Sequence, residues 1–187
     1  REMTARRDAL PAAELVRIAE ELVANIVSLP RYASARSVLA TMAIGSEWNT
    51  RLFLDRARAD GKRIVLPRIT APPRRLELHV VRDLEHDLVP GVWNIPEPDP
   101  VRCDRVEIGA VDFAVVPALA VDLDGYRLGY GAGYFDRLLS GRTAATYCVT
   151  ALPSAFVVDS LPHEAHDQPL DLVVDELGTR RTRDAKS

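Results

Sequence analysis

The sequence predicts an α/β fold: a three-layer, open and mostly parallel sheet with helices on both faces. Two segments indicate this fold. Residues 37–67 follow the pattern strand, helix, strand, a unit whose connection in a parallel sheet is a right-handed crossover. Residues 111–139 begin with an apolar strand, continue through a glycine-rich loop and end in a short helical pattern. Because 187 residues suffice to bury one core, we expect a single domain over residues 1–187.

The first half of the chain is assigned from hydrophobic periodicity and helix breakers. Residues 11–29 carry apolar side chains at helical spacing, and Pro30 ends this helix. Residues 37–44 are expected to form a buried strand, and the helix after them extends to about Ala59. Residues 62–67 form the next strand. These elements make up the predicted crossover unit.

Three further strands are expected, at residues 76–81, 111–120 and 144–149. Residues 76–81 alternate between apolar and polar side chains, as in a half-exposed strand, so we expect His79 to be solvated. Cys148 lies inside an apolar run and is expected to be buried and unreactive.

Composition excludes several classes of protein. The chain is 47% hydrophobic and 27% charged with a net charge of −3, which is typical of soluble globular proteins and argues against broad nucleic-acid binding. Two cysteines are too few for a disulfide scaffold, and a signal peptide or long apolar span is lacking. We therefore expect a cytoplasmic monomer without membrane contact. Since the sequence begins with arginine, we also expect native residues to precede Arg1.

The glycine-rich loop is the strongest candidate for ligand binding. Gly129, Gly131 and Gly133 stand at alternate positions, where positive φ angles and missing Cβ atoms let backbone N–H groups approach a ligand. A helix that begins near Gly133 adds the dipole of its N-terminus. Arg127 and Arg137 supply positive charge on either side. This arrangement suits a phosphate. The spacing matches neither the dinucleotide fingerprint nor the Walker loop.

Asp136 is out of place among phosphate-binding groups, because phosphate repels a carboxylate unless a cation lies between them. Mg²⁺ favours one or two carboxylates together with phosphate oxygens, so Asp136 is a candidate Mg²⁺ ligand. In the alternative interpretation, the glycines form a plain turn and Asp136 only complements the helix dipole. Spacing alone leaves both interpretations open.

Two further residues are candidates for substrate contacts. Glu47 follows the strand at residues 37–44, and open α/β sheets bind ligands at the carboxyl ends of their strands. Alternatively, Glu47 caps the helix that follows. Trp93 either stacks on a flat heterocycle or covers apolar surface, and the second interpretation is favoured.

The residues around the loop also form a long motif. It comprises residues 116–120 and 124–129, followed by Gly131, Gly133, Tyr134, Asp136 and Arg137. This motif resembles the signature of 5-formyltetrahydrofolate cyclo-ligases, also called methenyltetrahydrofolate synthetases. The resemblance extends over nearly the whole chain and is strongest over residues 112–139.

The resemblance implies ATP-dependent conversion of 5-formyltetrahydrofolate to 5,10-methenyltetrahydrofolate, with Mg²⁺ as cofactor and release of ADP and phosphate. It implies nucleotide contacts by Arg7, Arg127, Gly129, Tyr130, Gly131, Ala132, Gly133, Tyr134, Phe135 and Asp136. It implies catalytic roles for Tyr134 and Arg137, Mg²⁺ ligation by Asp136 and Asp167, and pterin or substrate contacts by Met42 and Glu47, with Trp93 as the further candidate above. His166 would orient Asp167. A Lys-x-x-x-Arg element that grips ATP phosphates in the family would lie before Arg1.

Four residues depart from the expected family pattern: Asn94, Phe135, Phe156 and Asp175. Asn94 replaces a glycine but tolerates left-handed φ angles, so we expect its turn to survive. The departures keep two alternatives open: a paralogue with the same ATP site but a different substrate or lost activity, and a nonenzymatic module that binds reduced folate.

Overall fold

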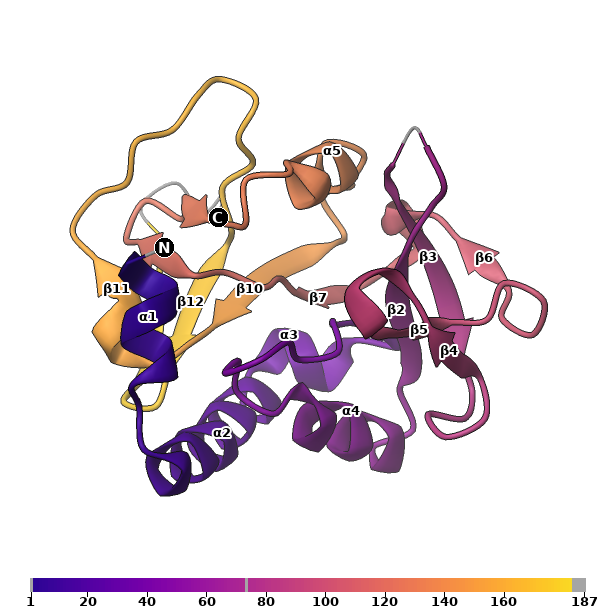
Figure 1. Ribbon diagram of the computed structural model, residues 1–187, viewed down its shortest axis with the longest axis horizontal. Helices are drawn as coiled ribbons and strands as arrows, with labels where there is room; N and C mark the ends of the chain where they lie inside the picture. Colours follow the sequence, from indigo (N-terminus) through magenta and orange to yellow (C-terminus); the bar gives the residue numbers. More distant parts are fainter. Residues whose placement is uncertain (1, 73, 183–187) are drawn as a thin grey trace.

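A computed structural model describes residues 2–72 and 74–182. Within them lies a central sheet of eight strands (Figure 1). These strands are β1 Ser37–Leu39, β2 Arg63–Ile69, β3 Leu76–Val81, β6 Arg105–Val106, β7 Phe113–Val115, β10 Tyr147–Ala151, β12 Leu172–Asp175 and β13 Gly178–Arg181. Their order is β13-β12-β10-β7-β1-β2-β3-β6. The five strands from β12 to β2 run parallel. Strand β13 pairs antiparallel with β12 on one side, and on the other side β3 pairs antiparallel with β2 and β6 pairs antiparallel with β3.

Two smaller sheets lie beside the central one. Strands β8 Ala120–Asp122, β9 Arg127–Leu128 and β11 Val157–Val158 form one, and β4 Leu88–Pro90 pairs with β5 Pro96–Pro98 in the other. Short 3₁₀ turns, η1 Val92–Asn94, η2 Ile108–Ala110 and η3 Ser154–Phe156, complete the connections. The β8–β9 hairpin leads directly into the glycine-rich loop.

Helices cover both faces of the central sheet (Figure 1). The helices are α1 Glu2–Asp8, α2 Ala12–Val27, α3 Pro30–Ser34, α4 Thr50–Ala59 and α5 Tyr134–Leu139. Helices α2, α3 and α4 pack on one face, α5 and η2 pack on the other, and α1 contacts the edge near β8 and β12. This arrangement confirms the predicted three-layer α/β fold. No described helix is long and apolar enough to cross a bilayer.

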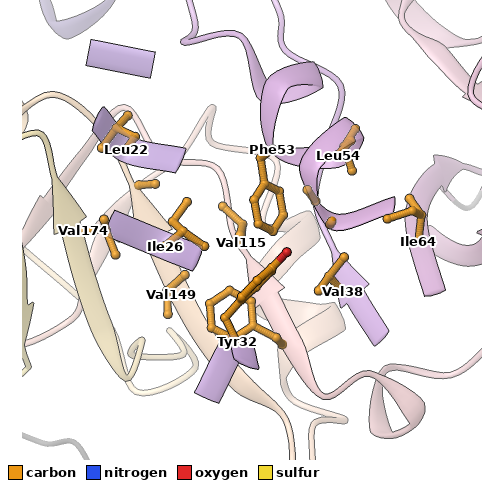
Figure 2. Packing of buried hydrophobic residues seen from close by; sticks show 14 of the residues in the cluster. Leu22, Ile26, Tyr32, Val38, Phe53, Leu54, Ile64, Val115, Val149 and Val174 are labelled. Carbon is orange, nitrogen blue, oxygen red and sulfur yellow. The ribbon is translucent and has the colours of Figure 1, made fainter. Parts of the chain in front are cut away.

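Alternation along the parallel strands builds the two core layers. Phe113 and Val115 of β7 face the layer of α2, α3 and α4, whereas Ala114 between them faces α5. Figure 2 shows Ile26 of α2 and Phe53 of α4 within the first layer, among side chains from the sheet such as Val115 and Val149. The amphipathic helix predicted at residues 11–29 is therefore confirmed as core packing.

Three predicted strand boundaries were wrong. The strand expected at residues 37–44 ends at Leu39, because the Ala40 N–H makes a last bond to Val65 O (3.3 Å) and the chain then leaves the sheet. The run at residues 111–120 divides into β7 and β8, separated by Pro117, which has no N–H to donate to a ladder. Strand β10 starts at Tyr147 rather than residue 144, because a turn precedes it.

His79 is buried (3% exposed), so the expectation that it is solvated was wrong. Its Nδ1 lies 3.0 Å from the Cys103 carbonyl oxygen, and β6 pairs with β3 alongside it. The alternating pattern predicted the strand correctly, but it could not show that the backbone at Cys103, 24 positions later, lies against this side chain.

Gly91 provides space for a buried carboxylate, and we expect alanine there to destabilise the fold. An added Cβ would lie 2.2 Å from Cδ and 2.3 Å from Oε2 of Glu97, which is 4% exposed. Gly91→Ala should lower the free energy of unfolding by about 2 kcal/mol, as overpacking does elsewhere. Urea denaturation measures the loss. Gly129→Ala is the control, since its Cβ would meet nothing within 4 Å; equal losses in both variants would contradict the steric argument.

Asp112 joins β7 to β1 and should make stability depend on pH. Its Oδ2 accepts hydrogen bonds from Arg36 N, Ser37 N and Ser37 Oγ, each 2.9 Å long. Burial by itself would raise the pKa of Asp112, but these hydrogen bonds outweigh it and lower the pKa in the folded state. The stabilisation is therefore present above the unfolded-state pKa and is lost as pH falls through the folded-state pKa.

We expect Asp112→Asn to lower the free energy of unfolding by about 1 kcal/mol at pH 7, because a charged acceptor is replaced by a neutral one. The difference from the wild type should shrink below about pH 4, near the unfolded-state pKa of aspartate. Urea denaturation across this pH range tests it. Asp104→Asn is a surface control, and a difference that stays constant with pH would refute the assignment.

Candidate active site

The largest concentration of predicted site residues lies at the carboxyl ends of the parallel strands. A small cavity there is lined by residues that follow β1, β7 and β10, together with Arg7 of α1. The chain runs from β1 to β2 on one side and places β7 on the other, so this edge is a topological switch point. Ligands in open α/β sheets bind at such points.

The loop after β1 brings Glu47 to this cavity. Asn49 is the N-cap of α4 and accepts a hydrogen bond from Arg51 N (3.1 Å), so the alternative that Glu47 caps this helix was wrong. Instead, Glu47 Oε2 accepts a hydrogen bond from Ile44 N (3.0 Å) and closes its own loop. Thr50 Oγ1 donates to Thr41 O (2.7 Å) and ties the end of the loop to its beginning.

Arg7 and Glu47, which line the cavity, contact Tyr130, which lies outside it. The Tyr130 hydroxyl donates to Glu47 Oε1 (2.8 Å) and accepts from Arg7 Nη2 (3.1 Å). Arg7 Nη1 also lies 3.6 Å from Glu47 Oε1. Burial raises the pKa of the Tyr130 hydroxyl. The hydrogen bond from Arg7 acts in the opposite direction, and the negative charge of Glu47 raises the pKa further. Three segments distant in sequence thus share one polar cluster.

The glycine-rich loop has the backbone that its sequence predicts at two of three positions. Gly131 (φ +84°) and Gly133 (φ +62°) are left-handed, a region that side chains with a Cβ rarely adopt. None of the N–H groups of residues 129–133 donates to another described residue. Arg137 Nη2 donates to Ala132 O (2.9 Å) and braces the loop. The loop therefore presents free amide donors that an anion can bind.

An open hollow separates this loop from α1. Thr4, Ala5 and Asp8 line one side and the segment Leu119, Gly129, Tyr130 and Gly131 lines the other, around a volume of about 550 Å³. Small-molecule sites commonly have volumes of roughly 300–1,000 Å³. The hollow adjoins the free amides of the loop and can admit a ligand of nucleotide size.

Arg127 and Asp136 form a largely buried ion pair below the loop. Arg127 Nη2 lies 2.8 Å from Asp136 Oδ1, and its Nη1 donates to Gln168 O (2.7 Å). Only 5% of the Arg127 side chain is exposed, against 22% for Asp136. Burial lowers the pKa of the Arg127 guanidinium, and the neighbouring Asp136 opposes this shift. Arg127 thus neutralises and orients Asp136, whereas the sequence suggested a direct phosphate contact.

The residues around Asp136 suit Mg²⁺ held jointly with a phosphate. Gln168 N donates to Asp136 Oδ1 (3.2 Å), which brings the neighbouring Asp167 into the same region. Among the described residues no three His, Cys, Asp or Glu side chains converge on a metal position. Two carboxylates completed by phosphate oxygens and water are a typical set for Mg²⁺ and a poor one for structural zinc. His166 Nε2 is 3.7 Å from Asp167 Oδ1, too far for the orienting hydrogen bond that was expected.

Comparison with known proteins identifies the family. The model of the 5-formyltetrahydrofolate cyclo-ligase family matches residues 1–176. The chain belongs to this family. The cyclo-ligase of Mycolicibacterium smegmatis is 35% identical over 136 residues, which cover 72% of this chain and 70% of that protein. The mouse cyclo-ligase is 25% identical over 94% of this chain and 90% of its own length.

Solved structures agree with this assignment. The 5,10-methenyltetrahydrofolate synthetase of Aquifex aeolicus superposes with a TM-score of 0.86 at 33% identity, over 100% of this chain and 92% of that one. The synthetase of Mycoplasma pneumoniae, at 21% identity and a TM-score of 0.73 over 94% of both chains, shares the fold. The protein is thus an enzyme of a ligase family, as the glycine-rich motif indicated.

The departures from the cyclo-ligase pattern have structural explanations. Phe135 packs beside the core layer under α5, and Phe156 is buried with Val121 and Leu152, so both rings replace polar groups with core packing. Asn94 has φ +59°, which confirms that asparagine keeps the left-handed turn. Asp175 binds Arg180 (2.9 Å) in the β12–β13 hairpin.

Two predicted substrate contacts lie apart from the cavity. Met42 packs partly buried against the core, and Trp93 is 66% exposed in η1; neither lines the cavity. Most of Trp93 is exposed, and whether its ring stacks on a heterocycle or covers apolar surface stays a prediction. Its φ of +57° is unusual for a non-glycine residue.

Sequence reasoning missed two residues of the site, Trp48 and Ser46. Trp48 lines the cavity, is 7% exposed and donates from Nε1 to Ala151 O (2.7 Å). Ser46 accepts from Arg7 Nε (2.9 Å) and donates to Asp8 Oδ1. The only sequence signal was their position beside Glu47 and Arg7, since nothing local predicts contacts between α1 and the loop after β1.

Proposed function

We propose that this enzyme uses Mg²⁺ and ATP to cyclise 5-formyltetrahydrofolate to 5,10-methenyltetrahydrofolate, with release of ADP and phosphate. One observation carries the proposal. A glycine-rich loop with free amide donors lies one hydrogen bond away from Glu47, the carboxylate assigned to the pterin. A phosphate donor and a reduced folate would therefore meet at the switch point of the sheet.

The chemistry requires activation of a poor leaving group. The formyl oxygen on N5 attacks the γ-phosphorus of ATP, the bond to the bridging oxygen breaks, and ADP leaves. N10 then attacks the activated formyl carbon, the carbon–oxygen bond breaks, and phosphate departs with that oxygen. Loss of the N10 proton leaves the methenyl bridge. Protein side chains act by positioning and charge neutralisation, as in other phosphoryl transfers.

Residues of the chain divide this work. The amides of residues 129–133 would bind phosphate oxygens, and Arg137, which already braces the loop, would offset their charge. Asp136, fixed by Arg127, and Asp167 would hold Mg²⁺, which neutralises charge on the phosphates. The Arg137 guanidinium lies 5.4 Å from the centre of the Tyr134 ring, so the two residues assigned catalytic roles contact each other.

One spectrophotometric experiment tests the function. Purified protein mixed with ATP, Mg²⁺ and 5-formyltetrahydrofolate should produce the absorbance of the methenyl product, and omission of either ATP or Mg²⁺ should abolish it. ATP binding without this absorbance would instead indicate a paralogue with another substrate. Folate binding that is indifferent to Mg·ATP would indicate a nonenzymatic binding module.

A further inference from the structure

Tyr130 belongs to the glycine-rich loop, yet its side chain points toward Glu47, the protein carboxylate assigned to the pterin. The residue is 55% exposed, while its hydroxyl lies between Glu47 Oε1 (2.8 Å) and Arg7 Nη2 (3.1 Å). The backbone of this residue is therefore part of the candidate nucleotide site, and its hydroxyl is part of the other site. Among the described contacts of residues 129–133, the Tyr130 side chain is the one that reaches Glu47.

The hydrogen bond to Tyr130 completes the fixation of Glu47. Oε1 accepts from the Tyr130 hydroxyl and Oε2 accepts from Ile44 N (3.0 Å), so both oxygens are held and the carboxylate plane is set. Each carboxylate oxygen has two lone pairs and keeps capacity for another donor. A carboxylate held in this way can accept two parallel N–H groups, which the amino-pyrimidine edge of a reduced pterin presents.

We propose that Tyr130 is a positioning residue for the folate: its hydroxyl holds Glu47 in the orientation that binds the pterin, and so links folate affinity to occupancy of the nucleotide loop. This inference rests on the proposed function. Tyr130 stands between Gly129 and Gly131, two residues without Cβ restraint, so its position follows the conformation of the loop. A phosphate bound to the loop amides orders the loop and, through Tyr130, orders Glu47. Linkage requires the effect to be reciprocal.

The test measures binding rather than turnover. Isothermal titration with 5-formyltetrahydrofolate is performed with and without Mg²⁺ and a non-hydrolysable ATP analogue. Wild-type protein should bind folate several-fold more tightly when the analogue is present. Tyr130→Phe should bind folate about tenfold more weakly, the loss expected for one hydrogen bond to a charged group, and should lose the enhancement by the analogue. Its affinity for the analogue alone should change less than about twofold, because backbone amides supply those contacts.

A double-mutant cycle separates positioning from a general structural effect. If Tyr130 acts through Glu47, Tyr130→Phe should cause almost no further loss of folate affinity in a Glu47→Gln background. Additive losses would overturn the proposal. Tyr126→Phe is the matched control, because its ring stacks on His163 (3.7 Å between centroids) outside the cluster; it should match wild-type folate affinity.

The outcomes also distinguish this inference from the proposed function. Wild-type protein that binds no reduced folate would refute both. Wild-type protein that binds and cyclises folate, with Tyr130→Phe unchanged in folate affinity, would refute the positioning role alone. In the turnover assay, the inference requires Tyr130→Phe to raise KM for folate about tenfold while kcat stays within roughly twofold, since no reacting atom is touched.

Discussion

Asp136→Asn is expected to reduce turnover of 5-formyltetrahydrofolate by about a thousandfold, the largest effect of any single substitution we propose. The amide keeps the shape of the side chain but loses the charge that would hold Mg²⁺ on the phosphates, and metal neutralisation of transition-state charge contributes several kcal/mol. The loss should appear in kcat at saturating ATP and folate. Higher Mg²⁺ concentrations should restore part of it, because the metal site is weakened rather than removed.

The Asp136→Asn variant requires a stability control, because Asp136 is paired with Arg127. Asp136→Asn leaves the buried Arg127 guanidinium facing a neutral amide, and removal of one member of a buried ion pair costs stability. Asp167→Asn avoids this difficulty, since its carboxylate accepts from Glu164 N (2.7 Å) rather than from Arg127. Both variants should lose turnover and Mg²⁺ dependence together. Wild-type turnover by a folded Asp167→Asn protein would remove Asp167 from the metal site, and the same result for Asp136→Asn would refute the metal assignment.

Glu47→Gln is expected to weaken binding of 5-formyltetrahydrofolate about a hundredfold while nucleotide affinity stays within roughly twofold. The neutral amide loses the charge that strengthens hydrogen bonds from the pterin, and its NH₂ group would face another donor. Two such bonds account for about 3 kcal/mol, or roughly a hundredfold. Titration of each ligand separately measures the two affinities.

Glu85→Gln serves as the matched control for Glu47→Gln, because Glu85 pairs with Arg51 at the surface and is 65% exposed. Its folate affinity should equal that of the wild type. Thermal unfolding should also show that Glu47→Gln remains folded, since Gln can still accept from Ile44 N. Equal weakening of folate and nucleotide binding would mean that Glu47 supports the whole cavity and does not select the pterin.

Local sequence patterns predicted an element well wherever the pattern depends on that element alone and not on what packs against it. The helix at residues 11–29 became α2 because its apolar stripe has helical spacing whatever packs against it. The glycines at 131 and 133 required left-handed backbone, and the structure has it. Strand ends were predicted poorly, as at Leu39 and Val115, because an apolar run continues into a buried loop without any change in composition.

The site was predicted as a set of residues but not as an arrangement. The sequence placed the positive charge of Arg127 two residues before Gly129, where it could meet a phosphate. Whether the guanidinium faces a ligand or Asp136 depends on the segment at Gln168, whose carbonyl accepts a hydrogen bond from it. In the same way, Trp48 had no local signal, because its role depends on Ala151 in a strand formed much later in the chain.

By itself the sequence determined the α/β class, the glycine-rich loop, the family motif and the candidate carboxylates, because short-range spacing and backbone conformation are properties of neighbouring residues. Tertiary structure alone decided which of these groups touch. Arg7 and Tyr130 are 123 positions apart, and Tyr130 and Glu47 are 83 apart. Such contacts arise when parallel strands align their carboxyl ends at one edge of the sheet, and this alignment depends on the packing of the whole core.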